Sequence, residues 1–563
     1  MVTYASERAA AVPGRAGAGV IGDNHSMLVD RVVRTSAAVA GSPGRLAKIA
    51  EIAGLLREVP PGEIPAAVAF LSGELTQRQI GVGYAAIIDL LGPHGDEALP
   101  PPPAEPALTL SAADAAFGAI GAQSGPGSQA QRRALLRGLL AQATEPEREF
   151  LTRLVGGELG QGALAGVMTE AIAAAAAVPA AAVRRAYQVS GSLALVATTA
   201  LSGPADGPDQ VTEALRAVRL QVGRPAAPML AATAPTMAAA LERISPAAVE
   251  WKIDGIRIQV HRSGDEVRVF TRTLDDITAR VPEIVAAARS LSATTAILDG
   301  EAVALAPDGR PRPFQVTSAR TASQGDPARL AEQTPLTPFL FDLLHVDGTD
   351  LLDVPAGERF ARLAAIAAPG LVIPRIVTAD EATAAAFFAE AIGRGHEGAV
   401  VKSLDAPYGA GRRGSDWIKV KPRHTLDLVV LAAEWGHGRR RGWLSNLHLG
   451  ARDEATGEPV MLGKTFKGLT DALLDWQTTR LLELADPPRP AGAEAREYGV
   501  VRVRPELVVE IAFDGVQAST RYPGGVTLRF ARVLRYRPDK TAAEADTIEA
   551  VRALWSGGDL GPG

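Results

Sequence analysis

A lysine, an aspartate, a glycine and an arginine stand close together at Lys252, Asp254, Gly255 and Arg257. From residue 256 to residue 261, apolar and polar residues alternate, which predicts a half-buried β-strand. Charged residues and a glycine are unusual at the start of such a strand. An amine that is partly desolvated and surrounded by cations loses its proton more easily and can act as a nucleophile. A glycine lets a ligand approach the backbone, so this stretch predicts a reactive site.

A hairpin predicted around this strand has its turn at Gly264–Asp265, because a glycine suits a two-residue turn. The resulting pairs are Val260 with Val269 and Ile258 with Thr271. The same register places Arg257 opposite Arg272. Two facing arginines repel each other unless an anion lies between them, although both could also bend apart into solvent.

Carboxylates and an aromatic side chain follow in the next apolar stretches. Asp299 and Glu301 lie two positions apart, on the same face of a predicted strand. Such a pair suits a hard cation such as Mg²⁺ or a ribose hydroxyl, and the ordinary alternative is a solvated strand face. Phe341 is set in another apolar strand, where it would either stack on a ligand or fill the core.

More charged residues occur between positions 397 and 421. They are Glu397 before an apolar strand, Lys402 at its end, Arg412 and Arg413 in a loop, and Lys419 and Lys421 on a strand face shared with Trp417. A solvated basic strand would explain the last group alone. Together, these residues match the needs of a bound nucleoside triphosphate, with an aromatic ring for the base, carboxylates for Mg²⁺ and ribose, and cations for phosphate. The sequence has neither a P-loop nor a dinucleotide-binding glycine motif.

The elements that must position these residues fall into segments that differ in their pattern of apolar and polar residues. We expect an extension at residues 1–26, a helical domain at 27–215, an α+β domain at 216–422 and a β-barrel domain at 423–563. The first segment has no apolar core of a signal peptide. The sequence therefore predicts a multidomain protein in which the α+β domain carries the reactive lysine.

The helical segment contains a faint internal repeat. Gly-Glu-Leu followed two residues later by Gln occurs at residues 73–77 and again at 157–161. Two subdomains of similar plan would explain the repeat. The glycines before Ser128 predict a helix that starts there, and a helix N-terminus with free N–H groups favours phosphate.

The composition limits the possible classes of protein. The chain has 563 residues, a net charge of −5, 47% hydrophobic residues and 21% charged residues, which is ordinary for a globular protein. It has no cysteine, so disulfides and thiolate zinc sites are excluded. No segment predicts a membrane span, and we expect a cytoplasmic protein.

Several segments in this order resemble the motifs of the covalent nucleotidyltransferases, which include ATP-dependent DNA ligases, RNA ligases and mRNA capping enzymes. Lys252-Ile-Asp-Gly-Ile-Arg257 resembles KxDGxR. The other segments are TR at 271–272, LDGE at 298–301, FDLLHVDG at 341–348, EGAVVK at 397–402, WIKVK at 417–421 and LRFARVLRYRPDK at 528–540. In the last one, Ala531 stands where proline is common. The whole pattern is most similar to the three-domain ATP-dependent DNA ligases.

This resemblance implies an all-α DNA-binding domain, an α+β adenylation domain and a β-barrel OB-fold domain. It implies that Lys252 attacks ATP, that Glu250 contacts adenine and that Phe341 stacks on it. Glu301 would hold ribose or metal, and Glu397 a metal. The residues implied to hold the nucleotide's phosphates are Arg257, Arg272, Lys402, Arg413, Lys419 and Lys421. AMP would pass from the lysine to the 5′-phosphate at a nick, and the 3′-hydroxyl would then displace it.

The resemblance also implies a partner, nicked duplex DNA, encircled by a monomer associated with the nucleoid. Basic tips at 436–442 and 464–468 would meet phosphates without reading sequence. The last motif carries five cations, Arg529, Arg532, Arg535, Arg537 and Lys540. They would orient pyrophosphate in the first step, which requires the C-terminal domain to rotate between steps. A solvated basic edge strand is the alternative for this segment.

Four other functions are alternatives to this one. An RNA ligase or a capping-type guanylyltransferase would use the same lysine, but the large helical segment before it argues against both. A non-catalytic DNA-binding scaffold would not need the full set of charged residues. An NAD-dependent ligase is disfavoured, because those enzymes bind zinc through cysteines.

Overall fold

The computed structural model describes residues 26–555, apart from 43, 79, 84–86, 88–98, 158, 162–164, 203–206, 324, 412, 423 and 488–498. The chain divides into two compact units, Met1–Arg219 and Leu220–Gly563. Each unit has its own hydrophobic core. The predicted reactive residues all belong to the second unit.

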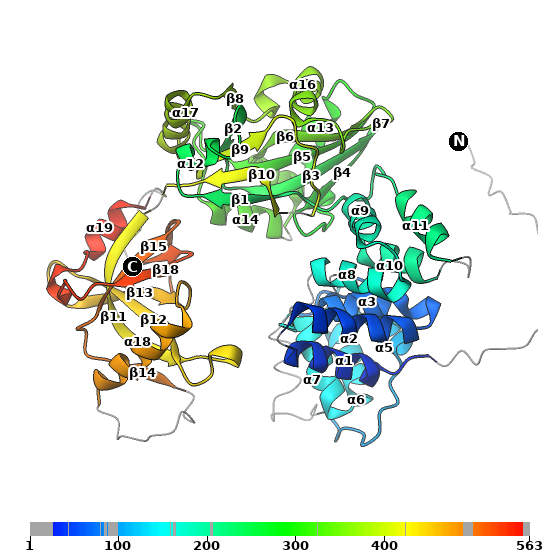
Figure 1. Ribbon diagram of the computed structural model, residues 1–563, viewed down its shortest axis with the longest axis horizontal. Coiled ribbons are helices and arrows are strands. Elements are labelled where there is room, and N and C mark those ends of the chain that lie inside the picture. Colours follow the sequence, from blue (N-terminus) through cyan, green and yellow to red (C-terminus); the bar gives the residue numbers. More distant parts are fainter. Residues whose placement is uncertain are drawn as a thin grey trace, which may run out of the picture. The chain divides into compact units, whose positions relative to one another are not determined.

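The regular elements in the described part of the first unit are helices (Figure 1, blue to cyan). They are α1 (Val29–Gly41), α2 (Arg45–Glu58), α3 (Ile64–Ser72), α5 (Leu110–Gly121), α6 (Ser128–Ala141), α7 (Glu145–Gly156), α8 (Ala165–Ala176), α9 (Ala180–Ser190), α10 (Leu193–Leu201) and α11 (Pro208–Arg216). Helix α2 packs mainly on α8, and α3 on α10. Phe70 on α3 and Phe117 on α5 are fully buried against each other, with ring centroids 5.8 Å apart.

The internal repeat occupies equivalent places in this unit. Helix α3 ends at Gly73 (φ 78°) and α7 ends at Gly157 (φ 71°), both in the left-handed conformation that glycine adopts without strain. Leu75 and Leu159, two residues further on, are both buried. Helix α6 begins at Ser128 as predicted, and its N-cap, Gly127, offers no side-chain cap.

The second unit begins with a pocket half, residues 220–422, built on two five-stranded sheets. Sheet 1 has the strand order β1 (Leu230–Ala234), β10 (Arg413–Val420), β9 (Gly398–Ser403), β2 (Ala247–Lys252) and β8 (Arg375–Thr378). Sheet 2 has the order β4 (Glu266–Thr271), β3 (Ile256–Ser263), β5 (Thr295–Ala304), β6 (Leu336–Val346) and β7 (Thr349–Asp350). Strands β2 and β3 are separated only by residues 253–255, so the predicted reactive stretch links the two sheets.

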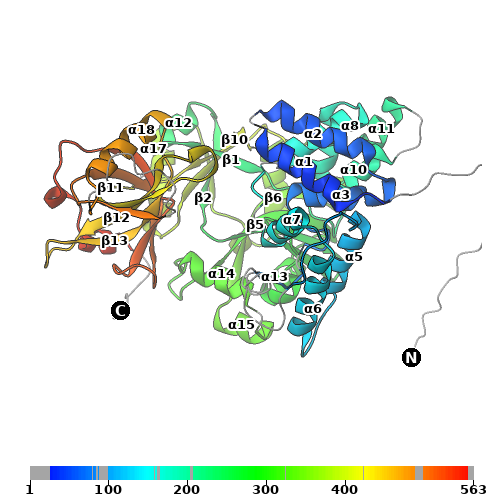
Figure 2. The same ribbon diagram turned by 90° about the horizontal axis from the view of Figure 1, so that it is seen from below.

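Helices cover these sheets. They are α12 (Met237–Leu241), α13 (Pro282–Arg289), α14 (Phe314–Ala322), α15 (Pro327–Gln333), α16 (Ala356–Ile366) and α17 (Glu381–Gly393). Helix α17 packs on β2, β8 and β9 of sheet 1, and α13 packs on β3, β4 and β6 of sheet 2. Figure 2 shows α13, α14 and α15 grouped beside β5 and β6.

The predicted hairpin register of β3 and β4 is confirmed. Val260 pairs with Val269 and Ile258 pairs with Thr271. Strand β4 ends at Thr271, so Arg272 lies just beyond the last pair. On its other side, β3 pairs with β5, and there Arg257 lies opposite Glu301. The anion expected beside the arginine is therefore supplied by the neighbouring strand.

The described part of the C-terminal half, residues 423–563, contains the remaining strands and the α-helices α18 and α19 (Figure 1, yellow to red). They are β11 (His424–Trp435), β12 (Leu444–Arg452), β13 (Pro459–Thr465), β14 (Val500–Arg502), β15 (Val508–Phe513), β16 (Gly515–Ala518), β17 (Val526–Arg529), β18 (Arg532–Tyr536), α18 (Asp471–Glu483) and α19 (Ile548–Ala553). One sheet runs β13-β12-β11-β15-β18, with β14 also paired to β11, and β16 and β17 form a separate ribbon. Contrary to the prediction, the described strands do not close into a barrel, because β13 and β18 are not paired. Strands β16 and β17 come between β13 and β18 in the sequence and form a ribbon of their own. In this ribbon, β17 contacts β13.

A search of the described helices found none with the length and apolar character of a membrane span.

Candidate active site

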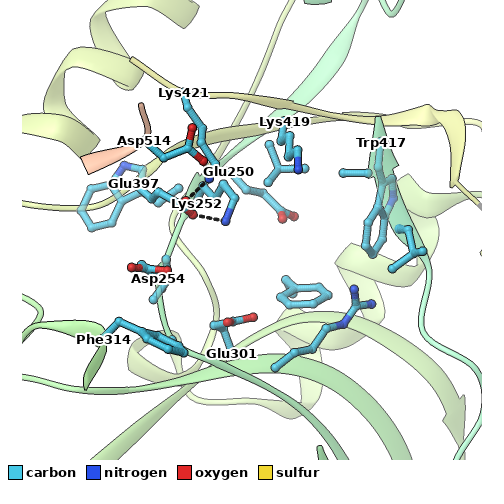
Figure 3. A pocket seen from close by; sticks show the side chains of 18 of the residues that line it. Glu250, Lys252, Asp254, Glu301, Phe314, Glu397, Trp417, Lys419, Lys421 and Asp514 are labelled. Carbon is cyan, nitrogen blue, oxygen red and sulfur yellow. Dashed lines mark hydrogen bonds and ion pairs between the residues drawn. The ribbon is translucent and has the colours of Figure 1, made fainter. Parts of the chain in front are cut away.

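A cavity of about 670 Å³ lies between the two sheets of the pocket half and extends to the C-terminal half. The predicted site residues that line it are Glu250, Lys252, Arg257, Arg272, Glu301, Phe341, Glu397, Lys402, Lys419 and Lys421. Figure 3 shows Lys252, Glu397, Lys419 and Lys421 on one side of this pocket and Glu301 across from them. Arg413 begins β10, but its side chain lies outside the described part of the chain. The pocket thus brings these ten residues together, whereas Asp299, Arg535, Arg537 and Lys540 do not line it.

Lys252 ends strand β2 and is held from two directions. Its backbone carbonyl accepts a 2.9 Å hydrogen bond from the N–H of Glu397, and its Nζ forms an ion pair with the Glu397 carboxylate. The sequence predicted a lysine among cations, whereas here its direct partner is a carboxylate. The amine must leave this carboxylate before its lone pair can attack an electrophile.

A chain of alternating charges continues from Glu397. Lys421 forms an ion pair with Glu397 and lies 2.8 Å from Oδ2 of Asp514, which follows β15 in the C-terminal half. Burial tends to raise the pKa of Glu397, but the ion pairs with the two lysines outweigh it and hold the pKa below its usual range. Burial tends to lower the pKa of Lys421, and its two carboxylate partners raise it instead. Glu397 is therefore ionised at neutral pH.

Arg257 is fixed by buried groups rather than left free in the pocket. Its Nε donates to Oδ1 of Asp299 at 3.1 Å and its Nη2 to the hydroxyl of Tyr408 at 3.2 Å. The same hydroxyl donates to Asp299 and accepts the backbone N–H of Met229 at 2.9 Å. Asp299 is 1% exposed. It is therefore a partner for the arginine, and Glu301 is the carboxylate of this strand that lines the pocket.

Glu301 lines the pocket near the positive charges of Lys252 and Arg257. Burial raises its pKa to about 7, against the opposing effect of Lys252 and Arg257. Among the described residues, no three carboxylates or histidines gather closely enough to enclose a metal ion. Glu301 and Glu397 are hard oxygen donors, which suit Mg²⁺ if phosphate oxygens and water complete the coordination.

An aromatic and charged wall closes another part of the pocket. The rings of Phe341 and Trp417 meet edge to face, with centroids 5.8 Å apart. Nζ of Lys402 lies 4.4 Å from the first centroid and 4.1 Å from the second, and 2.6 Å from Oε2 of Glu250. Burial lowers the pKa of Lys402 more than Glu250 and Asp342 raise it. This combination of apolar rings with one buried donor and one buried acceptor suits a nucleobase.

Gly255 is required by the packing of the two sheets. A Cβ atom at this position would lie 2.3 Å from the carbonyl oxygen of Ala302 on β5. A side chain is therefore excluded at Gly255 by the close approach of the backbone of the neighbouring strand β5.

The last motif divides its cations between two places. Arg529 and Arg532 line the pocket. Arg535 pairs with Glu510, while Arg537 and Lys540 both pair with Asp427, all within the C-terminal half. Only part of this motif therefore faces the pocket in this arrangement.

Several residues of the pocket were not predicted from the sequence. Phe314, Asp514 and Phe530 line it, and Tyr408 supports it from behind. Asp514 stands directly after the apolar strand β15, and this position could have drawn attention to it. Phe314 and Phe530 carried no signal that distinguishes them from core residues.

Comparison with known protein families gives matches along most of the chain. The profile described as "ATP dependent DNA ligase domain" matches residues 228–421. The profiles described as "ATP dependent DNA ligase C terminal region" and "DNA ligase N terminus" match residues 440–540 and 97–173. The profile at residues 228–421 contains all the residues predicted to hold the nucleotide and its metal, from Glu250 to Lys421.

Curated relatives match nearly end to end. A protein of Mycolicibacterium paratuberculosis named "Probable DNA ligase" is 55% identical over 94% of this chain and 98% of its own length. One of Mycobacterium marinum with the same name is 54% identical over 94% of this chain and 100% of its own length. A solved structure titled "Pmar-Lig_Pre." has a TM-score of 0.55 and 16% identity, covering 90% of this chain and 99% of that one, and so supports the fold. The chain belongs to the ATP-dependent DNA ligase family.

Proposed function

We propose that this ATP-dependent DNA ligase works through AMP bound covalently to Lys252, and that its substrate is a nick in duplex DNA. The observation that carries the proposal is the position of the Lys252 amine. It lies in a pocket that combines an aromatic wall with cations and five carboxylates, two of which, Glu301 and Glu397, are the predicted metal ligands. These are the groups that a nucleoside triphosphate and its metal need.

In the first step, Nζ of Lys252 attacks the α-phosphorus of ATP. An N–P bond forms, the P–O bond to pyrophosphate breaks, and the amine loses a proton. Arg257, Arg272, Lys419 and Lys421 would stabilise the charge on the phosphate oxygens. Glu250 and Lys402 would contact the base, with Phe341 stacked on it, and the cation of Arg413 would join the phosphate set.

Glu301 and Glu397 would hold Mg²⁺ together with phosphate oxygens. When bound, the ion supplies positive charge that stabilises the phosphoryl group in the transition state. Glu397 would have to exchange its contact with Lys252 for the metal, which frees the amine at the time when its substrate is present.

In the second step, a 5′-phosphate oxygen at the nick attacks the phosphorus of the lysyl-AMP and releases the lysine. In the third, the 3′-hydroxyl attacks the 5′-phosphate, AMP leaves and the strand is closed. The C-terminal half would act as an OB-type domain that contributes Arg529 and Arg532 to the pocket in this arrangement. Its rotation would bring Arg537 and Lys540 to the pyrophosphate in the first step.

The first unit would act as the DNA-binding domain of a monomer that encircles the duplex. Helices α2 and α6 both start after a glycine, Gly44 or Gly127, without a side-chain cap. Such helix starts favour phosphate groups. The basic segments 436–442 and 464–468 would contact phosphates from the C-terminal half, so we expect binding that depends on salt and not on sequence.

The test is to incubate the protein with Mg²⁺ and ATP labelled at the α-phosphorus, and then to measure label that stays on the denatured chain. We expect one label per chain in the wild type and none in Lys252→Ala. Lys48→Ala, which removes a lysine of the first unit that donates to the backbone carbonyl of Gln161, serves as a matched control for folding and should still accept the label. Label on Lys252→Ala would overturn the proposal. Parallel assays on nicked DNA and nicked RNA identify the polymer that is sealed.

A further inference from the structure

Arg375 lies behind the aromatic and charged wall of the pocket and contacts two residues of that wall, Glu250 and Phe341. It begins β8, the edge strand of sheet 1, and pairs directly with Glu250 across the strands. Its Nε donates to Oε1 of Glu250 at 2.7 Å, and its Nη2 donates to the same oxygen and, at 2.9 Å, to the backbone carbonyl of Phe341. Arg375 itself does not line the pocket.

The guanidinium of Arg375 is held in place by packing. Its Cζ lies 3.6 Å from the ring centroid of Phe360 on α16, and its side chain is 12% exposed. Phe341 belongs to sheet 2 and Glu250 to sheet 1. The arginine therefore fixes, in one rigid fork, the relative position of two groups that come from different sheets.

The hydrogen bonds determine what remains available on Glu250. An ionised carboxylate has about four acceptor positions, two on each oxygen. Arg375 occupies Oε1 twice, and Lys402 lies 2.6 Å from Oε2. One acceptor position is left on Oε2, next to an ammonium donor. Adenine presents an amino donor where guanine presents a carbonyl acceptor, so an acceptor here distinguishes the two bases.

We propose that Arg375 is a positioning residue for recognition of the 6-amino group: it holds Glu250 and Phe341 so that the free carboxylate oxygen meets adenine. This inference rests on the proposed nucleotide site. It predicts that Arg375 sets the preference for ATP over purine nucleotides that lack the amino group.

The experiment compares ATP with purine riboside triphosphate, which differs only in lacking that group, in single-turnover adenylation of the full chain. In the wild type we expect a preference for ATP on the order of 10- to 100-fold, the usual value of a hydrogen bond to a charged group. In Arg375→Met the preference should fall to about 3-fold or less, because the oxygen is no longer held in place. The loss should appear as a higher KM for ATP, with the rate at saturation within about 3-fold of wild type.

Two further variants make the result decisive. Arg262→Met removes an arginine of the same half that donates to the backbone carbonyls of Gly264 and Leu291, outside the pocket, and should keep the preference. Arg375→Lys keeps the charge but not the fork, so it should lose part of the preference even if Arg375→Met does not fold.

The outcomes separate this inference from the site assignment. An Arg375→Met or Arg375→Lys protein that uses both nucleotides less well but keeps the wild-type ratio has lost only structure, and that result overturns the inference. Glu250→Gln tests the site itself. If that variant retains the full preference for ATP, the assignment of Glu250 to adenine fails whatever Arg375 does.

Discussion

Arg529 and Asp254 join the two halves of the second unit. Nη1 of Arg529, at the end of β17, lies 2.5 Å from Oδ2 of Asp254, two residues after Lys252. A second ion pair, Lys421 with Asp514, joins the halves with the opposite polarity. Each half thus contributes one cation and one anion to the contact beside the reactive lysine.

Arg529→Gln should slow the sealing of a nick that already carries a 5′-adenylate about 5- to 10-fold, because a partly exposed ion pair contributes about 1 kcal/mol. The use of preadenylated DNA removes the first step from the measurement. Arg535→Gln is the matched control, since Arg535 pairs with Glu510 inside the C-terminal half. Equal losses in both variants would show that the contact with Asp254 has no special role.

Tyr408→Phe should raise the KM for ATP in adenylation about 5- to 20-fold, with a smaller effect on the rate at saturation. Its hydroxyl joins Asp299, Arg257 and the N–H of Met229, and its loss leaves buried polar groups without a partner. Tyr536→Phe removes another mostly buried hydroxyl, bonded to Gln477 in the C-terminal half, and should leave the KM unchanged. A similar rise in both variants would contradict the prediction.

Gly255→Ala should destabilise the pocket half by about 1–3 kcal/mol, the usual cost of forcing extra atoms into a packed region. The new Cβ would collide with the carbonyl of Ala302, and either β3 or β5 must move. Thermal unfolding measures the effect. Gly393→Ala at the end of α17, where a Cβ meets no atom within 4 Å, should leave the midpoint within about a degree. Equal midpoints for the two variants would rule out the steric explanation.

His261 should make stability depend on pH. Burial, with help from His345 and Arg268, lowers its pKa to about 3. Its Nδ1 accepts the N–H of Gly223 and its Nε2 contacts Gln259, so the neutral ring is the bonded form. Between pH 6.5 and 3 the unfolded chain takes up a proton that the folded chain does not, so stability is lost as the pH falls.

The measurement is urea unfolding of wild type and His261→Gln at pH 7.5 and pH 5.5. The stability of the wild type relative to the variant should fall by about 1.4 kcal/mol between these two values. A difference that does not change with pH would mean that the ring is protonated in the folded protein as well.

Local patterns predicted much of this structure. Alternation and one glycine turn were sufficient for the β3–β4 register, and the glycines before Ser128 marked the start of α6. These features depend on residues that are close in the chain. The charged and aromatic residues of the pocket were weak signals one by one, and together they indicated a nucleoside triphosphate site. The resemblance in the motifs added Glu250 and the role of each residue.

The parts that were missed depend on distant contacts. The partner of Arg257 is Asp299, on a strand that only the folded sheet brings alongside. Arg375 and Tyr408 act through residues far away in sequence, and neither stands in a pattern of its own. The strands of the C-terminal domain were predicted, but closure into a barrel is not found among the described strands, because alternation predicts strands and not the pairing of the first strand with the last.

The two ion pairs of opposite polarity hold the C-terminal half against the pocket half. Any swing of the C-terminal half must break both at once, and it exposes Asp254 and Lys421 together. A phosphate group that binds the cation of either pair, Lys421 or Arg529, therefore competes directly with closure, and raised ionic strength should favour the separated form.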